Sequence, residues 1–191
     1  AARMENLISD LLWLSRIESV EGERKDDQLD MVDLLTHLCD ELMPAWPDRK
    51  IELVTTSELC VLGSAAELRS AISNLIVNAL KYSEAPVKVT WANTVVGPEL
   101  LVEDQGLGID AKHIPRLTER FYRVDKSRSQ ATGGTGLGLA IVKHVAVSHD
   151  AKLFVDSEVG RGSTFRLVFP SERAVACAVC SRESRPVESR Q

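Results

Sequence analysis

The apolar residues of this chain recur at two spacings, one typical of helices and the other of strands. Helical spacing predicts four main helices, from residue 4 to near Gly22 and over residues 31–43, 64–82 and 140–148. Ser64 precedes Glu67 by three residues, which is the pattern of a capping box at the start of the third helix. The second helix stops before Pro44, because proline cannot continue a helix.

Shorter stretches rich in β-branched and apolar residues predict strands. They lie at residues 51–55, 60–62, 87–92, 100–103, 153–157 and 164–169. Pro98 falls in the turn of one predicted hairpin, and Gly160 and Gly162 fall in the turn of the last. Because the elements do not follow strict βαβ alternation, we predict an α+β fold: a two-layer sandwich in which helices cover one face of a mixed sheet.

The first helix stands apart from the rest of the chain. Its apolar stripe has no partner within its own segment, and the charged residues 22–30 that follow it predict a linker. The helix either folds back on the domain or forms one strand of a dimeric helical bundle, and we leave both open. We place one domain at residues 31–170, with a polar loop at 110–135 that resembles a lid, and a disordered tail at 171–191.

Composition narrows the class of protein. The 191 residues are 44% hydrophobic and carry a formal net charge of −5, which favours a globular domain and argues against nucleic acid as the main partner. No apolar run could span a bilayer, and the start resembles neither a signal peptide nor a complete N-terminus. Four scattered cysteines predict a reducing compartment, with the Cys177 and Cys180 spacing incidental.

The first of three candidate motifs lies on the third helix. Asn74, Asn78 and Lys81 follow each other at intervals of four and three residues, so they share one helix face. An amide oxygen can ligate Mg²⁺, and a lysine can reach a phosphate. Taken alone, the motif fits an ordinary solvated helix face better, because polar helix faces are common.

The second motif follows a predicted strand. Asp104 stands at the end of that strand, where its carboxylate could accept a hydrogen bond from the exocyclic amine of adenine. Gly106 and Gly108 would allow a sharp turn and a close approach to a ring. An ordinary strand-to-loop turn uses the same residue types.

The third motif is rich in glycine and leads directly into the last helix. Gly133, Gly134, Gly136 and Gly138 would expose backbone amides to an anion beside the positive end of the helix dipole. The motif is not a Walker A loop, because no Lys-Ser or Lys-Thr pair closes it. A flexible linker is the alternative interpretation.

Together the three motifs resemble the N, G1 and G2 boxes of the ATP-binding domain of sensor histidine kinases, a branch of the GHKL superfamily. Glu119 to Arg123 occupies the position of that family's F box, and Gly162 to Phe165 resembles the element near its last strand. The resemblance covers residues 4–170 and implies the Bergerat fold. Residues 113–126 are most similar to the phosphate-regulon sensor kinases.

The resemblance implies roles for individual residues. The ligands it implies are ATP and Mg²⁺, with Asn78 on the metal and Asn74 supporting the metal–phosphate end. It also implies phosphate contacts from Lys81, Arg123 and Lys126. The remaining nucleotide contacts are expected from Tyr82, Asp104, Gly106, Gly108, Ile109, Gly134, Thr135, Gly136, Leu137, Gly138 and Thr164.

One position separates the reactions that this fold supports. In the related gyrase, Hsp90 and MutL ATPases a glutamate that activates water lies four residues before the metal-binding asparagine. This chain has Asn74 there, and an amide cannot accept a proton from water. Phosphoryl transfer to an imidazole does not need that base, so Asn74 favours a kinase. A GHKL-type ATPase or clamp and a regulatory nucleotide-binding domain are the alternatives.

None of the four histidines matches the acceptor motif of the family, and His37 is predicted to be a structural or surface residue. The resemblance implies that residues 1–21 are the second helix of a dimerisation hairpin whose acceptor histidine precedes Ala1. It also implies a homodimer through that hairpin and a response regulator receiver domain as partner. The implied setting is the cytoplasmic domain of a sensor anchored in the inner membrane through regions absent here.

Overall fold

The computed structural model describes residues 2–19, 26–124 and 134–177. Its helices and strands, in chain order, are α1 Ala2–Ser19, β1 Asp27–Asp30, α2 Met31–Leu42, η1 Met43–Ala45, β2 Ile51–Thr55, β3 Leu59–Gly63, α3 Ala65–Tyr82, β4 Val87–Thr94, β5 Gly97–Asp104, η2 Ala111–Arg116, α5 Gly138–Ser148, β6 Lys152–Glu158, β7 Gly162–Val168, η3 Ser171–Arg173 and β8 Ala174–Ala176. Among these residues, no helix is long and apolar enough to cross a membrane.

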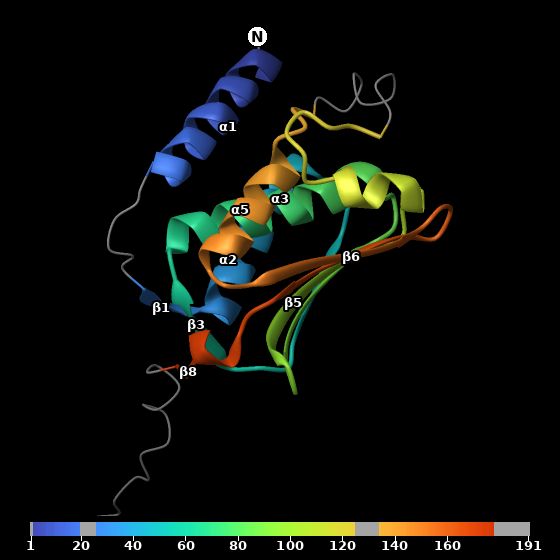
Figure 1. The fold of residues 1–191 in the computed structure, drawn as a ribbon. Coiled ribbons are helices and arrows are strands. Elements are labelled where there is room, and N and C mark those ends of the chain that lie inside the picture. Colours follow the sequence, from blue (N-terminus) through green and yellow to red (C-terminus); the bar gives the residue numbers. More distant parts are fainter. Residues whose placement is uncertain (1, 20–25, 125–133, 178–191) are drawn as a thin grey trace, which may run out of the picture.

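The main sheet has the strand order β2-β4-β5-β7-β6, with β2 and β4 parallel and the other pairs antiparallel. Helices α2, α3 and α5 lie over one face (Figure 1). Alternate residues of β5, such as Leu100 and Val102, point into the core between the two layers, where Trp91 and Phe169 pack edge to face. The predicted α+β sandwich with a mixed sheet is confirmed. Pro98 lies inside β5 opposite Asn93, so the predicted turn falls just before it.

A second, three-stranded sheet was not predicted from the sequence. Its order is β1-β3-β8, and both outer strands run antiparallel to β3. Residues 27–30 therefore belong to the fold rather than to the predicted linker, and residues 171–176 are not part of a tail. These outer strands have only three or four residues, too few to give a periodic signal.

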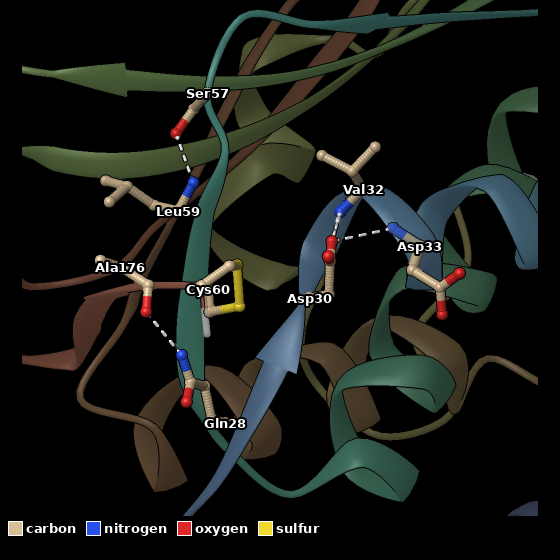
Figure 2. The surroundings of a disulfide bond; sticks show 9 residues. Gln28, Asp30, Val32, Asp33, Ser57, Leu59, Cys60 and Ala176 are labelled. Atoms are coloured by element: carbon tan, nitrogen blue, oxygen red, sulfur yellow. Dashed lines mark hydrogen bonds between the residues drawn. A yellow bond between two sulfur atoms is a disulfide. The ribbon is translucent and has the colours of Figure 1, made fainter. Parts of the chain in front are cut away.

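The cysteines differ from the sequence-based expectation. Cys177 is buried and forms a disulfide with Cys60 on β3, across a sequence separation of 117 residues (Figure 2). The expectation of reduced cysteines therefore does not hold for Cys60 and Cys177 in this structure. The predicted incidental spacing of Cys177 and Cys180 stays a prediction, because Cys180 lies outside the described residues. The Cys60–Cys177 pairing depends on β8 lying beside β3, a long-range contact that cysteine spacing cannot reveal. Cys39 is free, and burial raises the pKa of its thiol to about 11.

Helix α1 folds back on the domain only in part, and the predicted dimeric bundle stays a prediction. Near its C-terminal end, Leu14 is buried in the main core, with Trp13 and Ile17 packed beside it. Towards its N-terminus the apolar side chains stay exposed: Met4, Ile8, Leu11 and Leu12. One part of the helix thus folds back on the domain, while the other part presents an apolar face.

At the N-terminus of α3 the Ser64 cap is present, but Glu67 does not complete the predicted capping box. Ser64 Oγ accepts a hydrogen bond from the Glu67 amide at 3.4 Å, as expected for an N-cap. The Glu67 carboxylate, however, accepts from Ser148 Oγ. The Ser64 amide donates instead to Nε2 of the buried His149, at 3.0 Å, and His149 Nδ1 lies 2.8 Å from the carbonyl of Val145. His149 therefore connects the start of α3 to the end of α5.

Substitution of Gly63 tests this connection. A Cβ atom at Gly63 would lie 2.5 Å from Cδ2 of His149, a ring that cannot move without losing its bonds to Ser64 and Val145. We expect Gly63→Ala to lower the free energy of unfolding by about 1–3 kcal/mol, measured by urea denaturation. Gly134→Ala is the control, because no described atom lies within 4 Å of the position its methyl group would take, and its stability should change by less than about 0.5 kcal/mol. Equal stabilities of the two variants would contradict the prediction.

Candidate functional site

The first and third motifs meet where α3 packs on the start of α5. Asn74 Nδ2 donates to the Ser70 carbonyl at 2.9 Å, and this bond fixes the orientation of the amide. The Oδ1 atom then lies against Gly138, where a Cβ atom would come within 2.5 Å of it. The polar face of α3 and the N-terminus of α5 are therefore direct neighbours, as the motifs predicted.

Positive charge gathers at the C-terminal part of α3. Asn78 and Lys81 are half-buried on the same helix. Burial lowers the pKa of Lys81, a nearby Asp10 carboxylate opposes that shift, and the neighbouring Arg123 adds to it. The structure thus brings Arg123, from the segment after η2, close to Lys81. Tyr82 is exposed at the end of the helix, and Lys126 lies outside the described residues.

Asp104 ends β5 as a buried carboxylate, only 9% exposed. Its Oδ1 atom accepts a hydrogen bond from the Gly106 amide at 2.8 Å. Burial raises the pKa of this carboxyl, while hydrogen bonds from the Gly106 amide and from Ser163 oppose the rise. The result is an oriented acceptor at the end of the sheet, beneath the C-terminus of α3.

Two serines that the sequence motifs did not single out support Asp104. Ser163 lies directly opposite Asp104 in the β5–β7 pairing and hydrogen bonds to it. Ser157 Oγ lies 3.0 Å from Ser163 Oγ and accepts from the Ile109 amide at 2.8 Å. Ile109, which we predicted as a contact residue, is thereby tied to the carboxylate through two hydroxyls. The sequence did contain a signal for Ser163, because this serine directly follows Gly162 in the Gly162–Phe165 element near the last strand.

The predicted position of Thr164 close to the adenine stays a prediction, and its side chain lies on the other face of the sheet from the Asp104 side chain. Thr164 pairs with Glu103 on one side and Asp156 on the other, and successive residues of a strand point to opposite faces. Because Ser163 faces Asp104, Thr164 faces the side of the sheet away from the helices. There it lines an open hollow of about 570 Å³, and Asp104 and Ser163 at the strand ends belong to the same lining. No described residue of α3 or of the glycine segment lines that hollow, so the hollow reaches the candidate site only at its Asp104 end.

Gly108 and Gly136 have positive φ angles and lie in close backbone contact with other loops. Gly108 has a φ of +66°, and a Cβ there would lie 1.9 Å from the Glu158 carbonyl oxygen, so only glycine fits. Gly136 has a φ of +76°, and its carbonyl accepts from the Phe121 amide at 2.9 Å. Phe121 is itself left-handed at φ +63° and is exposed. The F-box segment is thus bonded to the third motif.

The side chains of the third motif have different surroundings. Gly134 has open space around it within the described part of the chain. Thr135 Oγ1 donates to Asp10 Oδ2 on α1 at 2.8 Å and accepts from the Leu137 amide at 3.3 Å. Leu137 is fully buried, so only its backbone could face a ligand. No side chain of the described residues caps α5, which leaves its first amides available to an anion.

Each of the four histidines lies within hydrogen-bonding distance of another group of the protein. His37 is exposed and bonds to the Asp33 carbonyl within α2, as the surface prediction required. His113 Nδ1 lies 2.6 Å from the hydroxyl of Tyr122 in the F-box segment. His144 lies 3.3 Å from the Ile17 carbonyl, and His149 is the buried link between α3 and α5.

Comparison with known proteins identifies the architecture. A family described as histidine kinase-, DNA gyrase B- and HSP90-like ATPase matches residues 63–173, more than half of the chain. The chain belongs to this ATPase family. The phosphate regulon sensor protein PhoR of Pseudomonas aeruginosa is 45% identical over 181 residues, which cover 92% of this chain and 41% of that protein.

Solved structures place the chain within the histidine kinase branch of the family. Full-length ShkA in complex with AMPPNP has a TM-score of 0.76 and 26% identity, covering 91% of this chain and 36% of ShkA. The mycobacterial sensor histidine kinase MprB has a TM-score of 0.67 and 29% identity, covering 76% of this chain and 97% of that one. The predicted resemblance to sensor histidine kinases and their phosphate-regulon branch is confirmed. The chain spans well under half the length of its PhoR relative, at 41%.

The buried Asp104 carboxylate should lower the free energy of unfolding of this ATPase-family domain when no ligand is bound. Because burial raises the pKa of Asp104 above its ordinary 3.8, the folded state binds a proton more readily than the unfolded state does. The stability cost of the ionised group is present above the raised pKa and disappears as the pH falls towards 3.8. We expect Asp104→Asn to raise the free energy of unfolding by up to about 1 kcal/mol at pH 8, and by less at pH 4.5.

Urea denaturation at the two pH values, with no nucleotide present, measures this difference. The exposed Asp48 provides the matched control. Because its charge is not buried, Asp48→Asn should change the free energy of unfolding little. If Asp104→Asn destabilises the protein at pH 8, the hydrogen bonds of the carboxylate outweigh its burial and the sign of the prediction is wrong.

Proposed function

We propose that this chain is the ATP-binding catalytic domain of a sensor histidine kinase. It transfers the γ-phosphoryl group of ATP to a histidine on a dimerisation hairpin, from which an aspartate of a response regulator receives it. The observation that carries the proposal is the neutral amide of Asn74, held against the N-terminus of α5 where the phosphates would lie.

The donor set fits a nucleotide. Asp104 offers an oriented carboxylate to an amino group, and adenine carries one beside its ring nitrogens. Ser163 holds that carboxylate in place from the neighbouring strand. At the other end, the uncapped N-terminus of α5 suits phosphate oxygens, and Lys81 and Arg123 add positive charge beside it. Gly106 and Gly108 form the turn beneath the proposed ring.

The residues also fit a bound Mg²⁺. Asn78 lies one helical turn beyond Asn74 and offers an amide oxygen, a hard ligand of the kind Mg²⁺ accepts alongside water and phosphate. Mg²⁺ would supply charge neutralisation of the phosphate oxygens. Asn74 would then support the metal–phosphate end, with Lys81 and Arg123 on the transferred group.

The chemistry of position 74 favours transfer over hydrolysis. Water must lose a proton as it attacks, and the amide of Asn74 has no basic site to accept it. The Nδ2 atom is also committed to the Ser70 carbonyl. An imidazole acceptor already carries a nucleophilic lone pair, so positioning and charge neutralisation are sufficient.

The comparisons support the wider setting of the proposal. PhoR is named a phosphate regulon sensor protein, and ShkA was solved with the nucleotide analogue AMPPNP. By analogy we propose that the whole protein is a two-component sensor with a homodimeric hairpin, a receiver-domain partner and an inner-membrane anchor. Helix α1 then corresponds to the second helix of that hairpin, and its exposed apolar face to the bundle side.

Phosphotransfer in trans tests the proposed function. The chain is incubated with Mg²⁺, γ-labelled ATP and the separately prepared hairpin of Pseudomonas aeruginosa PhoR. We expect acid-labile label on the hairpin and none on this chain. Asn78→Ala should reduce transfer at least about 100-fold, because it removes the proposed metal ligand. The exposed Asn93 on β4 provides the matched control, and Asn93→Ala should retain full transfer.

Each other result has a definite meaning. Steady-state release of phosphate without labelled hairpin would overturn the kinase proposal in favour of an ATPase. Binding of Mg-ATP with neither transfer nor hydrolysis would indicate a regulatory nucleotide-binding domain. Absence of ATP binding, measured by calorimetry, would remove the proposal altogether.

Asp10 of α1 should weaken ATP binding in this chain. Its carboxylate accepts from Thr135 at 2.8 Å and lies near Lys81, so it occupies the electrostatic position of a phosphate group. We expect Asp10→Asn to lower the Kd for Mg-ATP about 3–10-fold, with a smaller gain at high salt. Calorimetry at two salt concentrations measures this, with Asp48→Asn as the control of equal charge change. An unchanged or higher Kd would show that Asp10 does not compete with phosphate.

A further inference from the structure

The C-terminal segment 171–177 contains β8, which forms the edge of the small sheet on the opposite side of β3 from β1. Strand β8 pairs with β3 through three residues, and Gln28 of β1 donates from Nε2 to the Ala176 carbonyl at 2.6 Å (Figure 2). Because β3 runs directly into α3, the segment is attached to the strand that leads to the proposed metal and phosphate residues.

Arg173 adds a second attachment at the start of this segment. Its guanidinium is only 13% exposed and donates to the carboxylates of Asp26 and Asp150, each at 2.9 Å, and to the Leu62 carbonyl at 3.1 Å. One side chain thus connects the residues before β1, the end of β3 and the turn after α5. These contacts align β8 for its pairing with β3.

The two sulfurs provide the third attachment, and it alone is covalent. Cys60 and Cys177 are both buried, at 3% and 4% exposure, and are bonded to each other. The bond closes a loop with a sequence separation of 117 residues. That loop contains α3, β5, α5 and β7, and therefore every described side chain of the candidate site except Asp10.

We propose that Cys60 and Cys177 are a reversible thiol–disulfide modification site that locks the C-terminal segment onto β3. The partner is a small disulfide oxidant of the glutathione type. In the oxidised form the loop around the nucleotide site is closed. In the reduced form the segment is held by Arg173 and a three-residue strand pair, too short for independent stability, so it detaches and exposes both thiols.

The oxidation balances with glutathione disulfide. The Cys177 thiolate attacks one sulfur of glutathione disulfide, and the first glutathione leaves as a thiolate. The Cys60 thiolate then attacks the Cys177 sulfur of the mixed disulfide and displaces the second glutathione. The two cysteines lose two electrons, the two glutathione sulfurs gain them, and the two thiol protons end on the released glutathiones.

A metal site is the competing use of these sulfurs. An oxygen of Asp30 and the two sulfurs lie within 4.8 Å of one another. Asp30 Oδ1, however, already accepts from the amides of Val32 and Asp33 as the N-cap of α2 (Figure 2). A structural zinc site needs four ligands, and among the described residues this cluster offers three. The bonded sulfurs favour the redox site.

The experiment compares the whole chain in glutathione buffers of graded redox ratio. Free thiols are trapped by alkylation, and peptides are mapped by mass spectrometry for the Cys60–Cys177 linkage. We expect the linkage to form and disappear reversibly, and oxidation to raise the Tm by about 5–15 °C, because closing a long loop restricts the unfolded chain. Limited proteolysis should remove the C-terminal segment from the reduced form at least about 10-fold faster.

Variants separate the redox site from other causes. Cys177→Ser should abolish the dependence of Tm on redox ratio. The protease should cleave this variant at the rate at which it cleaves the reduced chain. Cys39→Ala and Cys180→Ser should both keep the dependence, since neither cysteine belongs to the proposed pair. If Cys177→Ser does not fold, peptide mapping of the unaltered chain still decides the assignment.

Three outcomes would overturn the proposal: a Cys177–Cys180 or Cys60–Cys180 linkage in the oxidised chain, a Tm independent of redox ratio, or stoichiometric zinc bound by the reduced chain and protecting both thiols from alkylation. None of these readouts uses nucleotide. Failure of the redox site is therefore distinguishable from failure of the proposed kinase function.

Discussion

The arrangement of the site depends on the contact between Asn74 and Gly138. At this point a Cβ atom at position 138 would lie 2.5 Å from Asn74 Oδ1, so any larger residue there would displace the Asn74 amide. The contact sets the open N-terminus of α5 beside the amide and lysine face of α3. The burial of Leu137 and Ile141 at the start of α5 holds the two helices at this separation, so packing in the core fixes the geometry of the polar groups.

Asp104 represents a second constraint, in which a buried carboxylate is retained although burial disfavours its charge. The fold compensates through neighbours: the Gly106 amide and Ser163 bond to the carboxylate, and Ser157 connects Ser163 to the Ile109 backbone. These bonds come from two strands and one loop. The orientation of the carboxylate is thus fixed by the sheet register, and an error of one residue in that register would point the carboxylate to the open face.

The elements that local patterns could predict are those with enough residues to show a period. Helices α2, α3 and α5 and the five strands of the main sheet follow from apolar spacing, and the three motifs follow from residue type. The features that were missed depend on contacts between distant residues. The β1-β3-β8 sheet and the Cys60–Cys177 bond need strands from both ends of the domain. The choice between Ser163 and Thr164 needed the phase of β7 relative to β5, which the sequence of β7 alone does not contain.

The same contact bears on the role that we propose for position 74. The Asn74 side chain reaches Gly138 with its oxygen while its nitrogen bonds back to the Ser70 carbonyl, so the amide spans the gap between its own helix and α5 in a single orientation. A glutamate is one methylene longer and has no donor for the Ser70 carbonyl, so it could not keep the orientation that the Asn74 amide has here. In this chain the packing against Gly138 accommodates a short, neutral side chain at position 74. Such a side chain suits the proposed phosphoryl transfer, because an imidazole acceptor is itself the nucleophile.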